Sequence, residues 1–205
     1  MSNIPNLLPT NSLLDRRQVV ATLLRDTAET PGGELLVVTG LGSTTYDAGA
    51  AGDRPLNFYL WGAMGGALMI GLGLAIARPE RRVLVITGDG EMLMGMGALA
   101  TVAAARRPNL SIAVLDNGQF GETGHQSSHT SLGADLAAMA RACGWAQGEI
   151  VTDMPGVEAL RLRLRNEVLF ATVRISPDEV PRFLPPRDGA NLTTRFRAAL
   201  GVPPS

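Results

Sequence analysis

Two glycine-flanked polar turns each follow an apolar segment of the chain. Gly88-Asp89-Gly90 follows the run RVLVIT, and Asp116-Asn117-Gly118 follows the run LSIAVL. Continuous apolar runs of this length are typical of parallel strands that are buried on both faces. Open α/β sheets bind ligands at the carboxyl ends of their strands, so Asp89 and Asn117 are predicted to meet at a ligand-binding edge.

The residue types at these turns suit a magnesium ion bound to a diphosphate. Asp89 and Asn117, 28 positions apart, offer a carboxylate and a carboxamide, which are hard oxygen ligands of the kind that Mg²⁺ prefers. Gly88 and Gly90 allow a phosphate to approach the backbone closely. The helix predicted to begin near Glu91 directs its free N–H groups toward an anion. The alternative is that both sequences are ordinary tight turns without a ligand.

Two further segments extend this pattern. Residues 57–65 read NFYLWGAMG, and residues 123–126 read TGHQ after the second turn. With the GDG and DNG turns at their spacing, these segments resemble the thiamine diphosphate-dependent decarboxylases, in particular the sulfopyruvate and phosphonopyruvate decarboxylases. The resemblance covers roughly residues 35–178. It implies that thiamine diphosphate and Mg²⁺ are the cofactors.

The resemblance assigns roles to individual residues. Asp89, Asn117 and the main-chain carbonyl of Gln119 would be the metal ligands. Met64 would be the apolar wedge between the two rings of the cofactor, and the carbonyl of Gly62 would accept a hydrogen bond from its 4′-amino group. The residues expected to bind the cofactor are Gly62, Ala63, Met64, Gly88, Asp89, Gly90, Glu91, Asn117, Gln119, Phe120 and Gly121. The alternative for Met64 is a place in the core of a helix packed on the sheet.

The loop after the second turn holds both histidines of the chain. The relatives carry TGGQ where this chain has Thr123-Gly124-His125-Gln126, so His125 replaces a glycine. We interpret residues 121–130 as a lid over the cofactor that brings Thr123, His125 or Gln126 near the substrate, with His125 as a candidate catalytic group. A solvated polar loop is the alternative.

Apolar periodicity predicts an α/β fold with a mainly parallel open sheet and helices on both faces, which is the fold of the diphosphate-binding domain in this family. The expected strands are 34–39, 82–87, 110–115 and 168–175, and the expected helices are 12–27, 62–77, 91–107, 135–143 and 155–165. Ser12 is expected to cap the first helix, and residues 43–57 are expected to form a loop. We expect one domain over residues 1–178, including an N-terminal arm, and a Pro/Arg-rich tail over residues 179–205.

Composition excludes several classes of function. The net charge of −1 gives no basic surface for nucleic acid, and a single cysteine, Cys143, excludes an internal disulfide. All 18 basic residues are arginine, as in a GC-rich bacterial genome, so neither a Schiff-base lysine nor a Walker lysine is present. The N-terminal sequence does not read as a signal peptide, and the longest apolar stretch is shorter than a membrane span. We therefore expect a cytoplasmic protein.

In the family that this chain resembles, a glutamate on a separate pyrimidine-binding domain activates the cofactor, and we find no such domain in the sequence. The chain is therefore predicted to be the diphosphate- and Mg²⁺-binding (beta-type) subunit of a split 2-oxo acid decarboxylase, a lyase active only with an alpha-type partner that supplies the glutamate. We expect an oligomer. A subunit of an acetolactate synthase-like carboligase and a non-catalytic cofactor-binding subunit are the alternatives.

Overall fold

The computed structural model describes residues 13–202, which are built around a six-stranded sheet. Its strand order is β2-β1-β3-β4-β8-β7, and every neighbouring pair of strands is parallel. The strands are β1 (Leu36–Thr39), β2 (Asn57–Tyr59), β3 (Val83–Gly88), β4 (Leu110–Asp116), β7 (Gly148–Val151) and β8 (Phe170–Arg174). A separate antiparallel ribbon pairs β5 (Gln119–Phe120) with β6 (Gln126–Ser127). The predicted α/β class with a parallel open sheet is confirmed.

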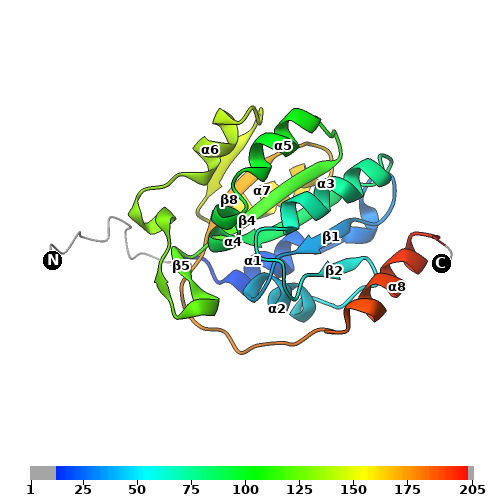
Figure 1. Cartoon of the computed structure of the whole chain (residues 1–205), viewed down its shortest axis with the longest axis horizontal. Coiled ribbons are helices and arrows are strands. Elements are labelled where there is room, and N and C mark those ends of the chain that lie inside the picture. Colours follow the sequence, from blue (N-terminus) through cyan, green and yellow to red (C-terminus); the bar gives the residue numbers. More distant parts are fainter. Residues whose placement is uncertain (1–12, 203–205) are drawn as a thin grey trace, which may run out of the picture.

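Helices cover both faces of this sheet (Figure 1). One face carries α1 (Arg16–Leu23), α2 (Ser43–Ala50) and α7 (Met154–Leu164); the other carries α3 (Ala67–Ala77), α5 (Ala98–Ala105) and α6 (Leu136–Ala142). Successive strand residues point to opposite faces, so Val37 joins the first core cluster and Val38 joins the second. This two-sided burial explains why the central strands are continuous apolar runs in the sequence.

The order in which successive strands are added across the sheet reverses between β1 and β3, although the strands remain parallel. From β1 the chain proceeds to β2 at one edge of the sheet, and it then returns to the other side of β1 to form β3 and β4. The chain leaves β1 toward α2 on one face, and it leaves β3 through the short α4 (Asp89–Met94) toward α5 on the other. The two connections diverge, and a crevice of this kind, outside the carboxyl ends of the strands, is where open α/β sheets bind ligands.

Residues 43–57, expected to be a loop, contain α2 and β2 instead. The first turn of α2 is rich in Ser and Thr, which are weak helix formers, so local propensity does not indicate the helix. Long-range contacts stabilise it. Asp47 is fully buried, and its carboxylate lies 2.6 Å from Nη1 of the buried Arg16 on α1. The expectation was wrong because tertiary structure overrides propensity here.

The helix expected over residues 62–77 begins only at Ala67. The residues before it form a turn, with left-handed φ angles of 54° at Ala63 and 86° at Gly65. The turn includes the predicted wedge, Met64, which is therefore not part of a helix. Its shape is held by a hydrogen bond of 2.8 Å from the Gly66 N–H to the Ala63 carbonyl.

The helix expected over residues 91–107 is also interrupted, since α4 ends at Met94 and α5 begins at Ala98. Gly95, between them, lies against Gly65: a Cβ on Gly95 would stand 2.3 Å from the carbonyl oxygen of Gly65. The two backbones approach too closely for a side chain, so α4 and α5 are separate helices here and α3 begins only after the turn that holds Gly65.

Residues 179–205, expected to be a tail, contain the helix α8 (Gly189–Ala199). It packs beside the edge strand β2 (Figure 1). The Asp188 side chain caps its N-terminus by accepting hydrogen bonds from the N–H groups of Ala190 and Asn191. Leu192 and Phe196 are buried, and the Phe196 ring meets the Phe58 ring edge-on at a centroid distance of 5.4 Å.

The segment that leads to α8 is attached to the domain by arginine–aromatic contacts. The Arg182 guanidinium lies 5.7 Å from the centre of the Tyr46 ring, and that of Arg187 lies 5.2 Å from the centre of the Trp61 ring. The Trp61 indole N–H donates a hydrogen bond of 2.9 Å to the Pro186 carbonyl. This segment therefore passes close to the turn that carries Met64.

The remaining predicted elements lie within a few residues of their expected ranges. The short strands β5, β6 and β7 were not predicted. The helix α1 begins at Arg16 and is capped by Asp15; Ser12 lies outside the described residues. Between residues 13 and 202, no helix has both the length and the apolar character needed to span a membrane.

We predict that Phe196→Ala lowers the free energy of unfolding by about 3 kcal/mol, because the ring is 7% exposed and fills space between α8 and β2. Phe183→Ala is the matched control, since Phe183 is 45% exposed, and its expected cost is about 1 kcal/mol or less. Urea unfolding at one pH measures both. Equal, small costs would show that α8 does not contribute to the core.

Candidate functional site

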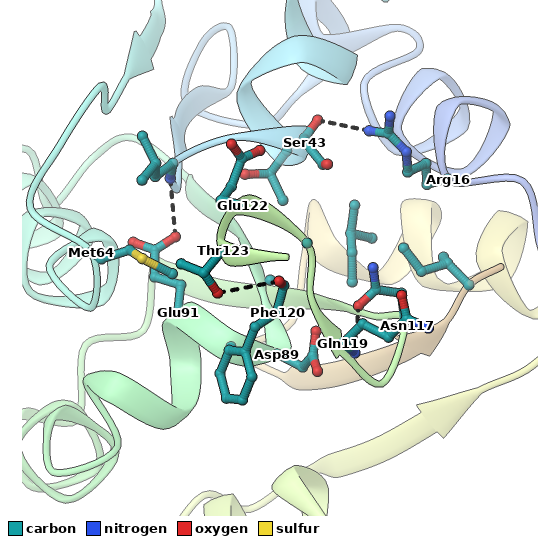
Figure 2. Close-up of a pocket in the computed structure, with 17 residues that line it drawn as sticks. Arg16, Ser43, Met64, Asp89, Glu91, Asn117, Gln119, Phe120, Glu122 and Thr123 are labelled. Atoms are coloured by element: carbon teal, nitrogen blue, oxygen red, sulfur yellow. Dashed lines mark hydrogen bonds between the residues drawn. The ribbon is translucent and has the colours of Figure 1, made fainter. Parts of the chain in front are cut away.

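A pocket lies at the carboxyl ends of the strands, at the crevice between the connections after β1 and β3 (Figure 2). It is lined by Arg16, Leu41, Ser43, Thr44, Met64, Gly88, Asp89, Gly90, Glu91, Leu115, Asn117, Gln119, Phe120, Gly121, Glu122, Thr123 and Ile175. Nine of the eleven residues predicted to bind the cofactor are in this lining. The exceptions are Gly62 and Ala63, which are exposed beside Met64.

Asp89 is the buried acidic group at one end of this pocket. Only 2% of the residue is exposed, and its Oδ2 atom accepts a hydrogen bond from the Ser128 hydroxyl. The Thr130 hydroxyl lies 3.2 Å from the same oxygen. Burial, and then the nearby carboxylate of Asp116, raises the pKa of Asp89 to about 6. The charged form of Asp89 is therefore disfavoured in the folded chain, and a nearby cation would stabilise it.

Asp116, which precedes Asn117, is neutralised within the chain and does not line the pocket. Its Oδ2 lies 2.6 Å from Nη1 of Arg174 on β8, and its Oδ1 lies 2.7 Å from the Thr130 hydroxyl. The same Oδ1 accepts the Gly118 N–H at 3.0 Å. Asp116 therefore shapes the turn after β4, and Asn117 is the residue of this pair that faces the pocket.

Asn117 and Gln119 lie together at the turn after β4 (Figure 2). The Asn117 Oδ1 atom accepts a hydrogen bond of 3.0 Å from the Gln119 N–H, which fixes the amide and leaves a second lone pair on that oxygen. The three predicted metal ligands, Asp89, Asn117 and Gln119, thus line one pocket. Nowhere in residues 13–202 do three or more His, Cys, Asp or Glu side chains cluster as a metal site.

Met64 extends from the turn after β2 into the pocket beside Glu91 (Figure 2). The left-handed conformation of Ala63 on one side and of Gly65 on the other sets the direction of this side chain. Met64 is half-buried, so it forms part of the pocket wall and is not enclosed in the core. The role of Met64 as a wedge between the cofactor rings stays a prediction.

Glycine makes room for Phe120 and for a ligand at the end of β3. A Cβ on Gly90 would stand 2.7 Å from the Phe120 ring, so that ring can cover the start of α4 only because residue 90 is glycine. A Cβ on Gly88 would meet nothing within 4 Å, and Gly88 faces the pocket. The space beside Gly88 and Asp89 is open to a ligand.

His125 does not line this pocket. It lies in an adjoining groove with Glu122, Asp178, Glu179 and Arg182. Its Nδ1 atom is 3.1 Å from the Gln119 side-chain oxygen, and its Nε2 atom is 3.2 Å from the Glu179 carboxylate. The backbone φ of His125 is 59°, a left-handed value that glycine adopts freely.

Glu91 is the second buried acid of the pocket. Its Oε2 atom accepts hydrogen bonds from the Thr87 hydroxyl at 2.9 Å and from the Leu41 N–H at 3.1 Å. Burial raises the pKa of Glu91, whereas the hydrogen bonds that its carboxylate accepts lower it. The sequence indicated a role for the backbone N–H groups that begin near Glu91, and it gave no signal for these side-chain contacts.

Other residues of the site were also missed. Arg16 on α1 reaches the pocket wall, where its Nη1 atom donates to the Ser43 carbonyl at 3.3 Å (Figure 2). Ser128 and Thr130 hold Asp89 from the far end of the 118–133 loop. None of these belongs to a motif near the two turns. The glycine-rich sequence at residues 40–42, after the first predicted strand, was the one local signal for this side of the pocket.

Comparison with known proteins agrees with this geometry. Residues 41–168 match the family described as "Thiamine pyrophosphate enzyme, C-terminal TPP binding domain". The sulfopyruvate decarboxylase of Methanosarcina acetivorans is 38% identical over 169 residues, which are 82% of this chain and 43% of that protein. The sulfopyruvate decarboxylase subunit beta of Methanothermobacter thermautotrophicus is 35% identical over 161 residues, which are 78% of this chain and 84% of that subunit.

The fold agrees as well. Benzoylformate decarboxylase from Polynucleobacter necessarius superimposes with a TM-score of 0.69 at 17% identity, over 88% of this chain and 36% of that one. The chain thus spans less than half the length of several relatives that it matches, and most of the length of the beta subunit. From its matched residues, its sheet and its pocket, the chain belongs to the thiamine pyrophosphate enzyme family and contains the C-terminal TPP-binding domain of that family.

Proposed function

We propose that this chain is the diphosphate- and Mg²⁺-binding subunit of a split thiamine diphosphate-dependent decarboxylase that acts on a small 2-oxo acid. The observation that supports this proposal most directly is that Asp89, Asn117 and Gln119 line one pocket. That pocket lies where the strand order of the sheet reverses, between β1 and β3. The enzyme would act in the cytoplasm. When bound, thiamine diphosphate would supply a nucleophilic carbon for the oxo group and an acceptor for the electron pair that remains when the carboxyl group leaves as CO₂.

The donor set of the pocket fits Mg²⁺ bound to a diphosphate. Mg²⁺ prefers six oxygen ligands and is usually held by one or two carboxylates together with phosphate oxygens and water. The pocket is lined by Asp89, Asn117 and Gln119, which would contribute a carboxylate, a carboxamide and, as predicted, a main-chain carbonyl. The metal would relieve the unfavourable burial of the Asp89 charge, and the open space beside Gly88 would admit the phosphates.

The ring end of the cofactor would lie on the side of the pocket formed by Met64. The flexible apolar side chain of Met64 would separate the two rings of the cofactor. This would hold the amino group of one ring close to the carbon of the other ring that must lose its proton. The Gly62 carbonyl would orient that amino group. Gly62 and Ala63 are exposed beside the pocket, which supports closure of the ring end by another subunit.

We propose that the other subunit is an alpha-type, pyrimidine-binding chain that supplies the activating glutamate, and that the assembly is an oligomer. The name of the subunit-beta relative supports a partner of this kind. Of the two glutamates in the pocket lining, Glu91 is held by Thr87 and Leu41. Glu122 packs against Gly42, since a Cβ on Gly42 would stand 2.3 Å from the Glu122 carboxylate. We therefore assign the activating glutamate to the partner and not to either of these residues.

The names of the relatives suggest a 2-oxo acid with a sulfonate or a phosphonate group as the substrate. His125 and Arg182 are cationic or potentially cationic side chains in the groove beside the pocket. A substrate bound to the cofactor could approach them from the mouth of the site. We keep His125 as a candidate catalytic residue on this basis.

We predict that Asp89→Asn weakens binding of thiamine diphosphate with Mg²⁺ by roughly 100-fold, on the order of the free energy of an interaction with a charged group. Calorimetry at pH 8 measures the affinity, and Asp26→Asn, on the far surface, is the control. The charged form of Asp89 is disfavoured in the folded chain, so the variant is expected to melt no lower than the unsubstituted protein at this pH. Equal affinities with Mg²⁺ and with a chelator would refute the metal site.

We predict that Met64→Ala lowers the turnover of the assembled enzyme by about 10- to 100-fold and changes the affinity for the cofactor by much less. The reason is that Met64 orients the rings, whereas the diphosphate and the metal anchor the molecule. The control is Met69→Ala, since Met69 is 43% exposed on α3 and lies outside the pocket. Unchanged turnover in the Met64 variant would mean that its side chain is only a wall residue.

We predict that the chain alone, supplied with thiamine diphosphate and Mg²⁺, does not release CO₂ from any of a panel of 2-oxo acids. The glutamate needed for activation would be absent, so deprotonation of the cofactor would be slow. Adding the alpha-type subunit is expected to restore turnover. Product analysis of that mixture distinguishes an aldehyde from a carboligation product. Robust turnover by the demonstrably partner-free chain would overturn the split-enzyme proposal.

A further inference from the structure

A proline-rich segment, residues 177–187, joins the end of β8 to α8 (Figure 1). Four of its residues are proline, and no helix, strand or turn forms within it. Proline has no N–H group, and it favours an extended backbone at the residue before it. Such a segment can be bound through its carbonyl oxygens and its proline rings, as proline-rich peptides are in aromatic-lined grooves.

The folded domain offers side-chain donors to carbonyl groups of this segment. Arg17 on α1 donates a hydrogen bond of 2.7 Å to the Pro181 carbonyl, and the Trp61 indole N–H donates one of 2.9 Å to the Pro186 carbonyl. The Arg17 Nε atom in turn lies 3.2 Å from the fully buried carboxylate of Asp47 on α2. Arg17 is therefore oriented by the domain and not only by the segment that it binds.

Two aromatic rings form the next part of the same surface. Tyr46 of α2 and Trp61 lie side by side, with ring centres 6.0 Å apart. Each ring is covered by a guanidinium group of the segment, from Arg182 and Arg187 respectively. The surface therefore presents aromatic rings to cations as well as donors to carbonyl groups.

Gly49 of α2 makes room for the middle of the segment. A Cβ on Gly49 would stand 2.9 Å from the Pro185 Cβ and 3.0 Å from the Phe183 ring. Pro185 is buried, whereas the residues on either side of it are exposed. The missing side chain at position 49 is therefore what admits the Pro185 ring. The residues that receive the segment are together called the docking surface: Arg17, Tyr46, Gly49 and Trp61.

Trp61 connects the docking surface to the cofactor pocket. It directly precedes the turn of residues 62–66, which carries Met64. The first two residues of that turn are exposed, so Trp61 is the nearest packed residue on this side of it. On the other side, Gly65 lies against Gly95. The position of Trp61 therefore bears directly on the Met64 end of the pocket.

We propose that residues 177–187 are an intramolecular proline-rich ligand of the docking surface, and that their docking holds Trp61 and the Met64 turn in the position that accepts the cofactor rings. The second half of this inference rests on the proposed binding of thiamine diphosphate. Trp61 is a positioning residue, since it acts through the turn and touches neither the metal nor the diphosphate. The docking itself involves only this chain and needs no cofactor.

Trypsin cleavage of the full chain tests the docking, because a protease can bind the segment around Arg182 only after it leaves the surface. In Gly49→Ala the new Cβ displaces the Pro185 ring, whereas alanine favours the helix α2 itself. We expect this variant to be cleaved after Arg182 about tenfold faster than the unsubstituted chain. Gly73→Ala is the matched control, since a Cβ at that position of α3 meets nothing within 4 Å.

Arg187→Gln gives the same test without a change in the core. Arg187 is exposed, and the substitution removes one of the two ring contacts. We expect cleavage after Arg182 to be about threefold faster in this variant. Cleavage of both variants at the rate of the unsubstituted chain would overturn the docking.

Two ligands report on the consequence for the pocket. In the proposed function thiamine diphosphate contacts both ends of the pocket, whereas Mg²⁺ with inorganic pyrophosphate contacts only the Asp89 end. We expect Gly49→Ala to lower the affinity for thiamine diphosphate by about tenfold relative to the affinity for Mg²⁺-pyrophosphate, as measured by calorimetry. Gly73→Ala is expected to leave the ratio unchanged.

The outcomes separate this inference from the proposed function. If Gly49→Ala releases the segment, and the ratio of the two affinities stays within about threefold of the unsubstituted value, the positioning role of Trp61 is overturned. If the unsubstituted chain binds neither ligand, the proposed function and the positioning role fail together. The cleavage rates then still decide whether residues 177–187 dock on the surface.

Discussion

The site depends on two neighbouring buried carboxylates whose negative charges are compensated to different extents. Asp89 and Asp116 lie at the ends of β3 and β4, and the Thr130 hydroxyl lies between them. The Arg174 guanidinium compensates Asp116 alone. The Asp89 carboxylate accepts hydrogen bonds from the hydroxyl groups of Ser128 and Thr130, and such neutral donors cannot neutralise its charge. The fold therefore stabilises one carboxylate as part of its own structure, whereas the other is the residue that we propose as a ligand of Mg²⁺.

The parts of the fold that the sequence predicted well are those with a clear physical period. The central strands are apolar on both sides, and their carboxyl ends carry the two glycine-flanked turns, so β3, β4 and the residues Asp89 and Asn117 could be placed directly. The turn after β4 was also recognisable, since Asn117 and Gly118 are typical turn residues. Eight of the nine predicted cofactor residues that line the pocket belong to these two turns or to the few residues after them, and the ninth, Met64, was assigned by family resemblance alone.

The parts that could not be predicted depend on contacts between distant residues. The helix α2 is stabilised by the buried ion pair of Asp47 with Arg16, and α8 by the burial of Phe196 against β2. The broken helices around residues 65 and 95 follow from a close approach of two backbones. Ser128 and Thr130, which hold Asp89, are separated from it by about forty positions and belong to no motif. No local pattern contains this information.

The position of α8 has a further consequence for the sheet. Open edges of sheets present unpaired N–H and C=O groups and are a route to aggregation. At one edge, α8 contributes Leu192 to the core on one face and Phe196 to the core on the other, so it covers β2. At the other edge, β7 is only four residues long and carries Glu149. A truncation before α8 would keep every pocket residue, yet it would uncover a strand that can pair with another molecule.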